Sequence, residues 1–290
     1  NEGAKTAMKL LRYGEPGAER PGLLDQDGHV RDLSSVVADI AGEVLSPAGL
    51  ARLAAIDPAS LPRASDSVRL GPPIPRPGKF IGIGLNYADH AEEAGMPIPE
   101  MPIVFYKASS CISGPNDDIL VPRGSDKLDY EVEFSFVIGT GGRYITREAA
   151  WDHVAGFTLV NDVSERTFQI DRGGLWSKGK SFDTFGPVGP FLVTRDEIAD
   201  PGNHPLMTKV NGEVRQDGTT ATMIFDIPSI IEHLSQYQTL EPGDLVCTGT
   251  PPGVGMGFKP TRFLNAGDSI ELSSPVLGTQ SMRVVVDPLA

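Results

Sequence analysis

Short apolar runs separated by glycines and prolines dominate the chain from residue 79 onward. Runs of roughly four to eight β-branched and aromatic residues between such breaks are typical of strands. We predict strands over residues 80–84, 102–106, 130–138, 155–160, 189–194, 206–210, 244–248, 269–272 and 281–286. No regular alternation of strand and helix runs through this region, so we expect a mainly β, α+β domain with a mixed sheet and not a doubly wound one.

Helices are predicted at fewer places. Capping residues and helical apolar spacing favour helices over residues 34–45, 47–54, 86–94, 147–153, 163–169 and 227–236. Two further strands, over residues 9–13 and 21–24, open the chain, and six prolines between residues 58 and 77 indicate a linker. We therefore predict a small N-terminal α/β domain at residues 8–70 and a larger domain at residues 71–290. Residues 1–7 precede a methionine and are expected to be an expression remnant.

The charge of the chain limits its expected partners, and its cysteines indicate the expected compartment. The 290 residues include 38 acidic and 25 basic side chains with no basic cluster, so neither nucleic acid nor an anionic membrane is an expected partner. No apolar run approaches the roughly 20 residues needed to span a bilayer. Cys111 and Cys247 lie far apart without metal-ligand spacing, and we expect both to be buried apolar side chains of a reduced, cytoplasmic protein.

Two carboxylates on one face of an apolar strand are the strongest chemical signal. Glu131 and Glu133 lie in Asp129-Tyr-Glu-Val-Glu-Phe-Ser-Phe-Val-Ile138, and because a strand alternates its faces, both side chains point the same way. Like charges roughly 7 Å apart on a strand face repel, and burying them unpaired is unfavourable. A hard divalent cation with oxygen ligands is the simplest group to expect between them.

A third carboxylate supports this interpretation. Asp162 ends another predicted strand, Gly156-Phe-Thr-Leu-Val-Asn-Asp162. The alternative is an edge strand that carries its glutamates on a solvated face and binds nothing. The β-forming residues that continue from Phe134 to Ile138 favour an interior strand instead, and three carboxylates on two strands favour a metal site.

The segment Asn86-Tyr-Ala-Asp-His-Ala-Glu-Glu-Ala-Gly95 contains a candidate general base. His90 and Glu93 are three residues apart and share a helix face, so Glu93 can accept a hydrogen bond from the imidazole, an arrangement suited to activating water. The alternative is a surface helix whose pair does nothing. Gly95 and the prolines at 97, 99 and 102 follow, and they suit a loop that orders over a substrate.

Further candidates are weaker when each is taken alone. Lys180, in Trp176-Ser-Lys-Gly-Lys-Ser-Phe182, could hold a substrate carboxylate or stabilise an oxyanion, but such a segment is more often a solvated loop. Arg166 and Gln169 share that ambiguity. Thr250 lies in Cys247-Thr-Gly-Thr-Pro-Pro-Gly-Val-Gly255, whose glycines would let backbone N–H groups approach an anion. The usual P-loop, serine-hydrolase and HExxH motifs are missing from the sequence.

Taken together, these segments resemble the fumarylacetoacetate hydrolase family over about residues 79–286. The matching segments are Gly84-Leu-Asn-Tyr-Ala-Asp-His-Ala-Glu-Glu93, Asp129-Tyr-Glu-Val-Glu133, Asn161-Asp-Val-Ser164, Lys178-Gly-Lys-Ser181, Lys209-Val-Asn-Gly-Glu213 and Thr248-Gly-Thr-Pro-Pro-Gly-Val-Gly255. Residues 8–14, 39–47 and 114–118 look closer to one branch, the 2,4-diketo-3-deoxy-sugar-acid (L-fuconate/L-rhamnonate) hydrolases often labelled ureidoglycolate lyase-like.

The resemblance implies a fumarylacetoacetate hydrolase-like mixed β-sandwich roll, usually dimeric, that acts on a small 2-oxo acid. It assigns Mg²⁺ or Mn²⁺ to Glu131, Glu133 and Asp162. His90 and Glu93 match the lid dyad of the family and Lys180 its active-site lysine. The positions that contact substrate match Arg166, Gln169, Lys180 and Thr250.

For a 2,4-diketo-3-deoxy sugar acid, the resemblance implies hydrolysis of the C3–C4 bond. Glu93 would orient His90, which removes a proton from water, and the hydroxide would add to the C4 carbonyl, with Lys180 stabilising the oxyanion. The pyruvate enolate would leave with help from the metal as Lewis acid, and the other product would be a hydroxy acid such as L-lactate. The alternatives are an oxaloacetate decarboxylase, an isomerase of dienoic dicarboxylates, a ureidoglycolate lyase, and a metal-stabilised binding protein without activity.

Overall fold

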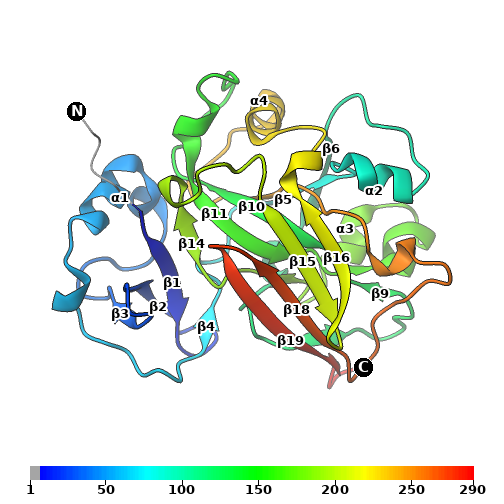
Figure 1. Ribbon diagram of the computed structural model, residues 1–290, viewed down its shortest axis with the longest axis horizontal. Coiled ribbons are helices and arrows are strands. Elements are labelled where there is room, and N and C mark those ends of the chain that lie inside the picture. The colour runs from blue at the N-terminus through cyan, green and yellow to red at the C-terminus, as the bar shows by residue number, and fades with distance from the viewer. Residues whose placement is uncertain (1–6) are drawn as a thin grey trace.

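Two β-sheets packed face to face form the body of the computed structural model, which describes residues 7–290 (Figure 1). The larger sheet contains β1 (Lys9–Tyr13), β2 (Arg20–Leu24), β3 (Val30–Asp32), β4 (Leu70–Gly71), β5 (Phe80–Gly84), β6 (Ile103–Lys107), β10 (Val132–Ile138), β11 (Val154–Asn161), β14 (Leu192–Thr194) and β17 (Leu245–Cys247). Its order is β3-β2-β1-β14-β11-β10-β17-β5-β6, with β4 paired to β1.

The smaller sheet has the order β16-β15-β18-β19-β8. Its strands are β8 (Ile119–Val121), β15 (Pro205–Val210), β16 (Glu213–Thr219), β18 (Ser269–Ser274) and β19 (Gly278–Val286). Four short strands form two separate pairs: β7 (Ile112–Ser113) with β13 (Gly186–Pro187), and β9 (Leu128–Asp129) with β12 (Ser164–Glu165). The mainly β, α+β prediction is therefore confirmed.

The helices are short and lie around the sheets (Figure 1). They are α1 (Pro47–Ala54), α2 (Ala88–Glu93), α3 (Trp176–Lys180), α4 (Ile227–Tyr237) and the π-helical turn η5 (Thr167–Asp171). The 3-10 turns are η1 (Gly42–Leu45), η2 (Pro58–Ser60), η3 (Ser109–Cys111), η4 (Ala150–His153), η6 (Arg195–Glu197), η7 (Thr220–Thr222) and η8 (Gly255–Gly257). None of the helices within residues 7–290 is long and apolar enough to cross a membrane.

The core lies between the sheets and is densest around β10. All seven residues of β10 are buried, because its two neighbours in the sheet are β11 and β17 and the smaller sheet packs against one face. Phe134 of β10 and Phe157 of β11 contact each other, with ring centroids 5.0 Å apart. Gln280 of β19 donates to the carbonyl oxygens of Leu159 and Gly189, both at 3.0 Å, and so ties the two sheets together.

Three predicted helices differ from the structure. Residues 34–41 form turns instead of a helix, because the Asp32 carboxylate accepts from the Ser34 N–H and Gly42 adopts a positive φ of 54°. Of residues 147–153, only η4 is helical. Residues 163–169 begin as β12 and continue into η5. The elements that were not predicted are β3, β8, β16, the two-residue strands and α3.

The N-terminal segment is continuous with the larger sheet. β1 pairs with β14 through Lys9 and Val193, which places β1, β2 and β3 in the same sheet as β10. The division into domains at residues 8–70 and 71–290 stays a prediction. The expected expression remnant lies, apart from Ala7, outside the described residues.

Candidate active site

Three buried carboxylates meet where two neighbouring strands end. β10 begins one residue after Glu131, and β11 ends one residue before Asp162. The register pairs Val132 with Asn161, so Glu131 and Asp162 lie side by side, and the Asp162 N–H donates to the Glu131 carbonyl oxygen at 2.9 Å. Glu133 follows on the same face of the strand. One ligand oxygen from each of the three carboxylates lies within 4.8 Å of the other two.

Two buried lysines pair with these carboxylates. The Lys180 ammonium, at the end of α3, donates to Asp162 at 2.6 Å and to Glu131 at 3.1 Å. It also donates to the Ser164 hydroxyl at 2.9 Å, so all three of its N–H groups are used. Lys107, at the end of β6, donates to the second Asp162 oxygen at 2.5 Å. Lys107 was not predicted as a site residue, because it precedes Asp162 by 55 residues and belongs to no local motif.

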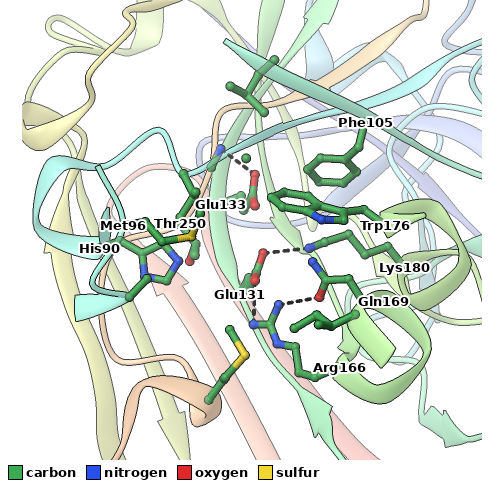
Figure 2. Close-up of a pocket in the computed structure, with 17 residues that line it drawn as sticks. His90, Met96, Phe105, Glu131, Glu133, Arg166, Gln169, Trp176, Lys180 and Thr250 are labelled. Carbon is green, nitrogen blue, oxygen red and sulfur yellow. Dashed lines mark hydrogen bonds and ion pairs between the residues drawn. The ribbon is translucent and has the colours of Figure 1, made fainter. Parts of the chain in front are cut away.

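Arg166 is held between two carboxylates. Its Nε donates to Asp129 at 2.9 Å, and one terminal nitrogen donates to Glu131 at 2.7 Å. The other terminal nitrogen donates to the Gln169 side-chain oxygen at 3.0 Å. That contact turns the Gln169 amide nitrogen toward the Lys180 side of the site (Figure 2). Gln169 can therefore donate to a ligand, whereas the charge of Arg166 is already matched within the protein.

The pKa values of the glutamates move in opposite directions. Burial alone would raise the pKa of Glu131, but the charges of Lys180 and Arg166 outweigh it and lower that pKa to about 2. Burial, together with the charges of Asp162 and Glu131, raises the pKa of Glu133 well above its usual value. Within residues 7–290, none of the ion pairs includes Glu133. One carboxylate of the group therefore lacks a cationic partner.

The residues fit a hard divalent cation. Three carboxylates with oxygens within 4.8 Å of one another form the oxygen-rich donor set that Mg²⁺ and Mn²⁺ prefer. Glu133 is buried beside the other two carboxylates without a cationic partner among the described residues, and such a cation would balance its negative charge. The predicted assignment of Glu131, Glu133 and Asp162 to a metal is consistent with this geometry and stays a proposal.

The predicted dyad is assembled on α2. His90 Nδ1 lies 3.0 Å from one oxygen of Glu93, because the two residues are three apart on the helix. The other Glu93 oxygen accepts the Gly253 N–H at 2.9 Å, which fixes the carboxylate. An ionised Glu93 therefore selects the tautomer with the proton on Nδ1 and leaves Nε2 as the basic nitrogen of His90.

Residues 249–256, called the glycine loop below, bind the site's own carboxylates. Their backbone N–H groups donate from Gly249 to Glu133 (2.8 Å), from Gly253 to Glu93 (2.9 Å), and from Gly255 and Met256 to Asp129 (2.6 and 3.0 Å). The sequence predicted that this loop approaches an anion, and the anions are carboxylates of the protein. Gly253 is required here, since its φ is +104° and a Cβ atom would lie 1.9 Å from the Arg215 carbonyl oxygen.

A cavity of about 260 Å³ connects the dyad and the carboxylates. In Figure 2, His90 and Thr250 lie on one side, Lys180 and Arg166 lie on the other, and Glu131 lies between them. Seven of the nine predicted site residues line this cavity. Glu93 reaches it through His90, and Asp162 contacts the lining residue Lys180.

Thr250 has a structural role in addition to lining the cavity. Its hydroxyl donates to the Val132 carbonyl oxygen at 2.8 Å and accepts from Gln216 at 2.7 Å. The thiols of Cys111 and Cys247 are buried and free, as expected, and burial raises the pKa of Cys111 to about 11. Neither thiol lines the cavity.

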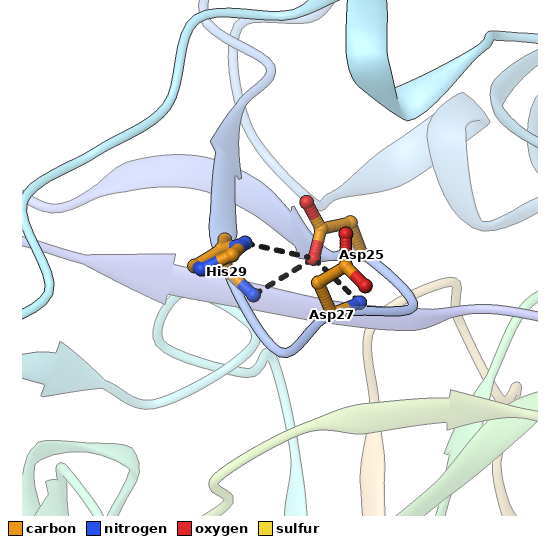
Figure 3. A group of neighbouring side chains, drawn as sticks. All are labelled: Asp25, Asp27 and His29. Carbon is orange, nitrogen blue, oxygen red and sulfur yellow. Dashed lines mark hydrogen bonds and ion pairs between the residues drawn. The ribbon is translucent and has the colours of Figure 1, made fainter.

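A second acidic group, Asp25, Asp27 and His29, lies in the turn between β2 and β3 (Figure 3). Asp25 accepts the N–H groups of Asp27 and His29 at 3.0 and 2.8 Å and pairs with Arg31 at 2.7 Å. These contacts stabilise the turn, and we assign no ligand to it.

Comparisons with known proteins give the family to which the chain belongs. Residues 79–285 match the model of the fumarylacetoacetate (FAA) hydrolase C-terminal family. A Burkholderia multivorans protein, provisionally named as a hydrolase, is 58% identical over 274 residues, 94% of this chain and 97% of that protein. The solved fumarylacetoacetate hydrolase of Exiguobacterium antarcticum is 37% identical with a TM-score of 0.84, and the match covers 97% of this chain and 100% of that one.

A third similar structure carries ligands. The maleylpyruvate hydrolase of Sphingobium sp. SYK-6, solved with manganese(II) and pyruvate, is 29% identical with a TM-score of 0.80, and the match covers 96% of this chain and 99% of that one. Isomerases are also among the similar solved structures. These matches support an enzyme with hydrolase or related activity, whereas the sugar-acid branch stays a prediction. The chain belongs to the fumarylacetoacetate hydrolase family.

Proposed function

We propose that this protein is a divalent-metal-dependent hydrolase that cleaves the C3–C4 bond of a 2,4-dioxo acid. The substrate is a 2,4-diketo-3-deoxy sugar acid of the kind derived from L-rhamnonate or L-fuconate, and the products are pyruvate and L-lactate. Mg²⁺ as the metal in use, a homodimer and a cytoplasmic location belong to the same proposal.

The observation that carries the proposal is a general-base dyad that faces a cavity lined by two of the three clustered carboxylates. His90 lines the cavity with its Nδ1 held by Glu93, and Glu131 and Glu133 line it as well. A base suited to activating water therefore lies beside a site suited to a Lewis acid. A decarboxylase needs no attack by water on carbon, so the dyad favours hydrolysis.

The charge balance suits a 2-oxo acid. The ionic cluster consists of the carboxylates Asp129, Glu131, Glu133 and Asp162 and the cations Lys107, Arg166 and Lys180. Four carboxylates and three cations leave one negative charge, so a divalent ion would leave one positive charge. The single carboxylate of a 2-oxo acid would neutralise it.

The protein's own residues would then divide the work. Glu93 holds the His90 ring so that Nε2 takes a proton from water, and the resulting hydroxide adds to the C4 carbonyl carbon. The Gln169 amide donates to the substrate, and Lys180 can stabilise the C4 oxyanion if it exchanges one of its three hydrogen bonds. When bound, the metal supplies a Lewis acid that favours departure of pyruvate. One water is consumed, the C3–C4 bond breaks, and C3 gains a proton.

The test measures pyruvate release and Mn²⁺ affinity for a His90→Ala variant and for the wild-type protein. We expect pyruvate release from the dioxo acid to fall by about 100-fold or more, the usual range for removing a general base. Mn²⁺ affinity, measured by calorimetry, should stay within about threefold, because His90 is not one of the proposed ligands. Full turnover by the variant would exclude this mechanism.

A further inference from the structure

The cavity wall outside the ionic cluster is apolar. Its main contributors are Leu85, Met96, Phe105, Ile170, Trp176 and Met256. The Trp176 ring lies 5.7 Å from the Phe105 ring and covers Gly84, where a Cβ atom would approach the indole at 2.4 Å. Packing therefore fixes the central part of this wall, and Figure 2 shows both rings on one side of the cavity.

The cations that line the cavity already have partners. Arg166 pairs with Asp129 and Glu131 at 2.9 and 2.7 Å. Lys180 pairs with Glu131 and with Asp162 at 3.1 and 2.6 Å. His90, the remaining basic residue of the lining, faces Glu93. A second substrate carboxylate would therefore lie against apolar side chains without a cation, which is strongly unfavourable.

We infer that the substrates are monocarboxylic 2,4-dioxo acids whose C4 substituent is short and uncharged, and that dicarboxylic acids of the same length are poor substrates. The inference rests on the proposed function, because it takes the carboxylate and the 2-oxo group to lie at the ionic cluster. The tail must then face the apolar wall. A 6-deoxy sugar acid fits, since its tail carries one hydroxyl and ends in a methyl group, whereas maleylpyruvate and oxaloacetate carry a second carboxylate.

The test compares two acids that differ at one end. Butyrylpyruvate and succinylpyruvate have the same seven-carbon chain, but the first ends in a methyl group and the second in a carboxylate. With Mg²⁺-loaded protein, we expect kcat/KM for succinylpyruvate to be at least about 100-fold lower, as expected for a charge that loses its hydration without gaining a partner. Values within about threefold of each other would overturn the inference and leave the proposed hydrolysis intact.

A variant tests the cause of this selectivity. Met256 lines the cavity, is 37% exposed, and donates to Asp129 through its backbone N–H, so Met256→Lys places a cation in the apolar wall and keeps that hydrogen bond. We expect it to raise kcat/KM for succinylpyruvate, relative to butyrylpyruvate, by about tenfold. Met101→Lys is the matched control, because Met101 is 59% exposed and lies outside the cavity lining. An equal gain in the control would contradict the explanation.

A binding measurement separates this inference from the reaction. 2-Oxopentanoate and 2-oxoglutarate also differ by a terminal methyl group and a carboxylate, and calorimetry on the Mn²⁺-loaded protein needs no turnover. We expect 2-oxopentanoate to bind about 100-fold more tightly. If neither acylpyruvate is cleaved but this preference holds, the proposed reaction is wrong and the tail selectivity stands. Equal binding of the two acids would refute the selectivity whether or not cleavage occurs.

Discussion

Glu93→Gln gives the sharpest prediction for the dyad, because it changes the protonation of His90 while keeping the shape of its partner. In the protein, one Glu93 oxygen accepts from Gly253 at 2.9 Å and the other lies 3.0 Å from His90 Nδ1. A glutamine would keep its oxygen on the Gly253 N–H and turn its NH₂ group toward Nδ1. His90 would then accept at Nδ1 and carry its proton on Nε2, where it cannot take one from water.

The expected loss follows from this change of tautomer. General-base catalysis by a positioned side chain contributes about 10²–10⁴-fold, so we expect kcat to fall about 1,000-fold. That loss corresponds to about 4 kcal/mol of transition-state stabilisation. The free energy of unfolding should change by less than about 1 kcal/mol, since the contact with Gly253 is kept and the Glu93 side chain is 20% exposed.

The assay follows pyruvate release by wild-type protein, Glu93→Gln and Glu92→Gln, each loaded with Mg²⁺. Glu92 is the matched control, because it neighbours Glu93 on α2 and is exposed. Mn²⁺ affinity should be the same for all three proteins. A Glu93→Gln variant that keeps kcat within about threefold of wild type would refute the assignment of His90 as the base.

Three further predictions concern the charges. Glu133→Gln should stabilise the metal-free protein by about 1–2 kcal/mol, because it removes a buried carboxylate without a cationic partner, and thermal unfolding checks this. The same variant should weaken Mn²⁺ binding about 100-fold or more, as measured by calorimetry. Lys107→Met should reduce the free energy of unfolding in urea by about 3–5 kcal/mol, since it leaves Asp162 with one lysine. Lys209→Met, which removes a partly exposed ion pair with Glu271, should change it by less than about 1 kcal/mol. The backbone N–H of His29, and less strongly Arg31, lower the pKa of Asp25 to about 2, so its contribution to stability is present above about pH 4 and lost as the pH falls toward 2. The free energy of unfolding of Asp25→Asn should therefore be lower than that of wild type above about pH 4, and the difference should vanish as the pH falls toward 2.

The strands that carry the three clustered carboxylates were predictable because their signal is local. Glu131 directly precedes β10 and Glu133 lies at its start, alternating with apolar residues, and Asp162 directly follows β11, so position along the chain indicated which side chains meet. The dyad was predictable for the same reason, since a spacing of three residues places His90 and Glu93 on one helix face.

The partners of these residues could not be predicted, because their contacts depend on the tertiary fold. Lys107 belongs to β6 and reaches Asp162 only once β5 has paired with both β6 and β17. Asp129 accepts the N–H groups of Gly255 and Met256, which lie 126 and 127 positions further along the chain. The backbone N–H groups of the glycine loop are predicted to approach an anion, but no local pattern indicates that the anions are Glu93, Asp129 and Glu133. The apolar wall depends on α3, whose five residues are too few to give a helical pattern.

The most direct test of the central claim is product analysis by ¹H NMR. EDTA-stripped protein is incubated with 2,4-diketo-3-deoxy-L-rhamnonate, with and without Mg²⁺, and oxaloacetate is run in parallel. The account predicts equal amounts of pyruvate and lactate from the dioxo acid, formed only when Mg²⁺ is added. Turnover of oxaloacetate alone, or cleavage of the dioxo acid that does not depend on the metal, would contradict it.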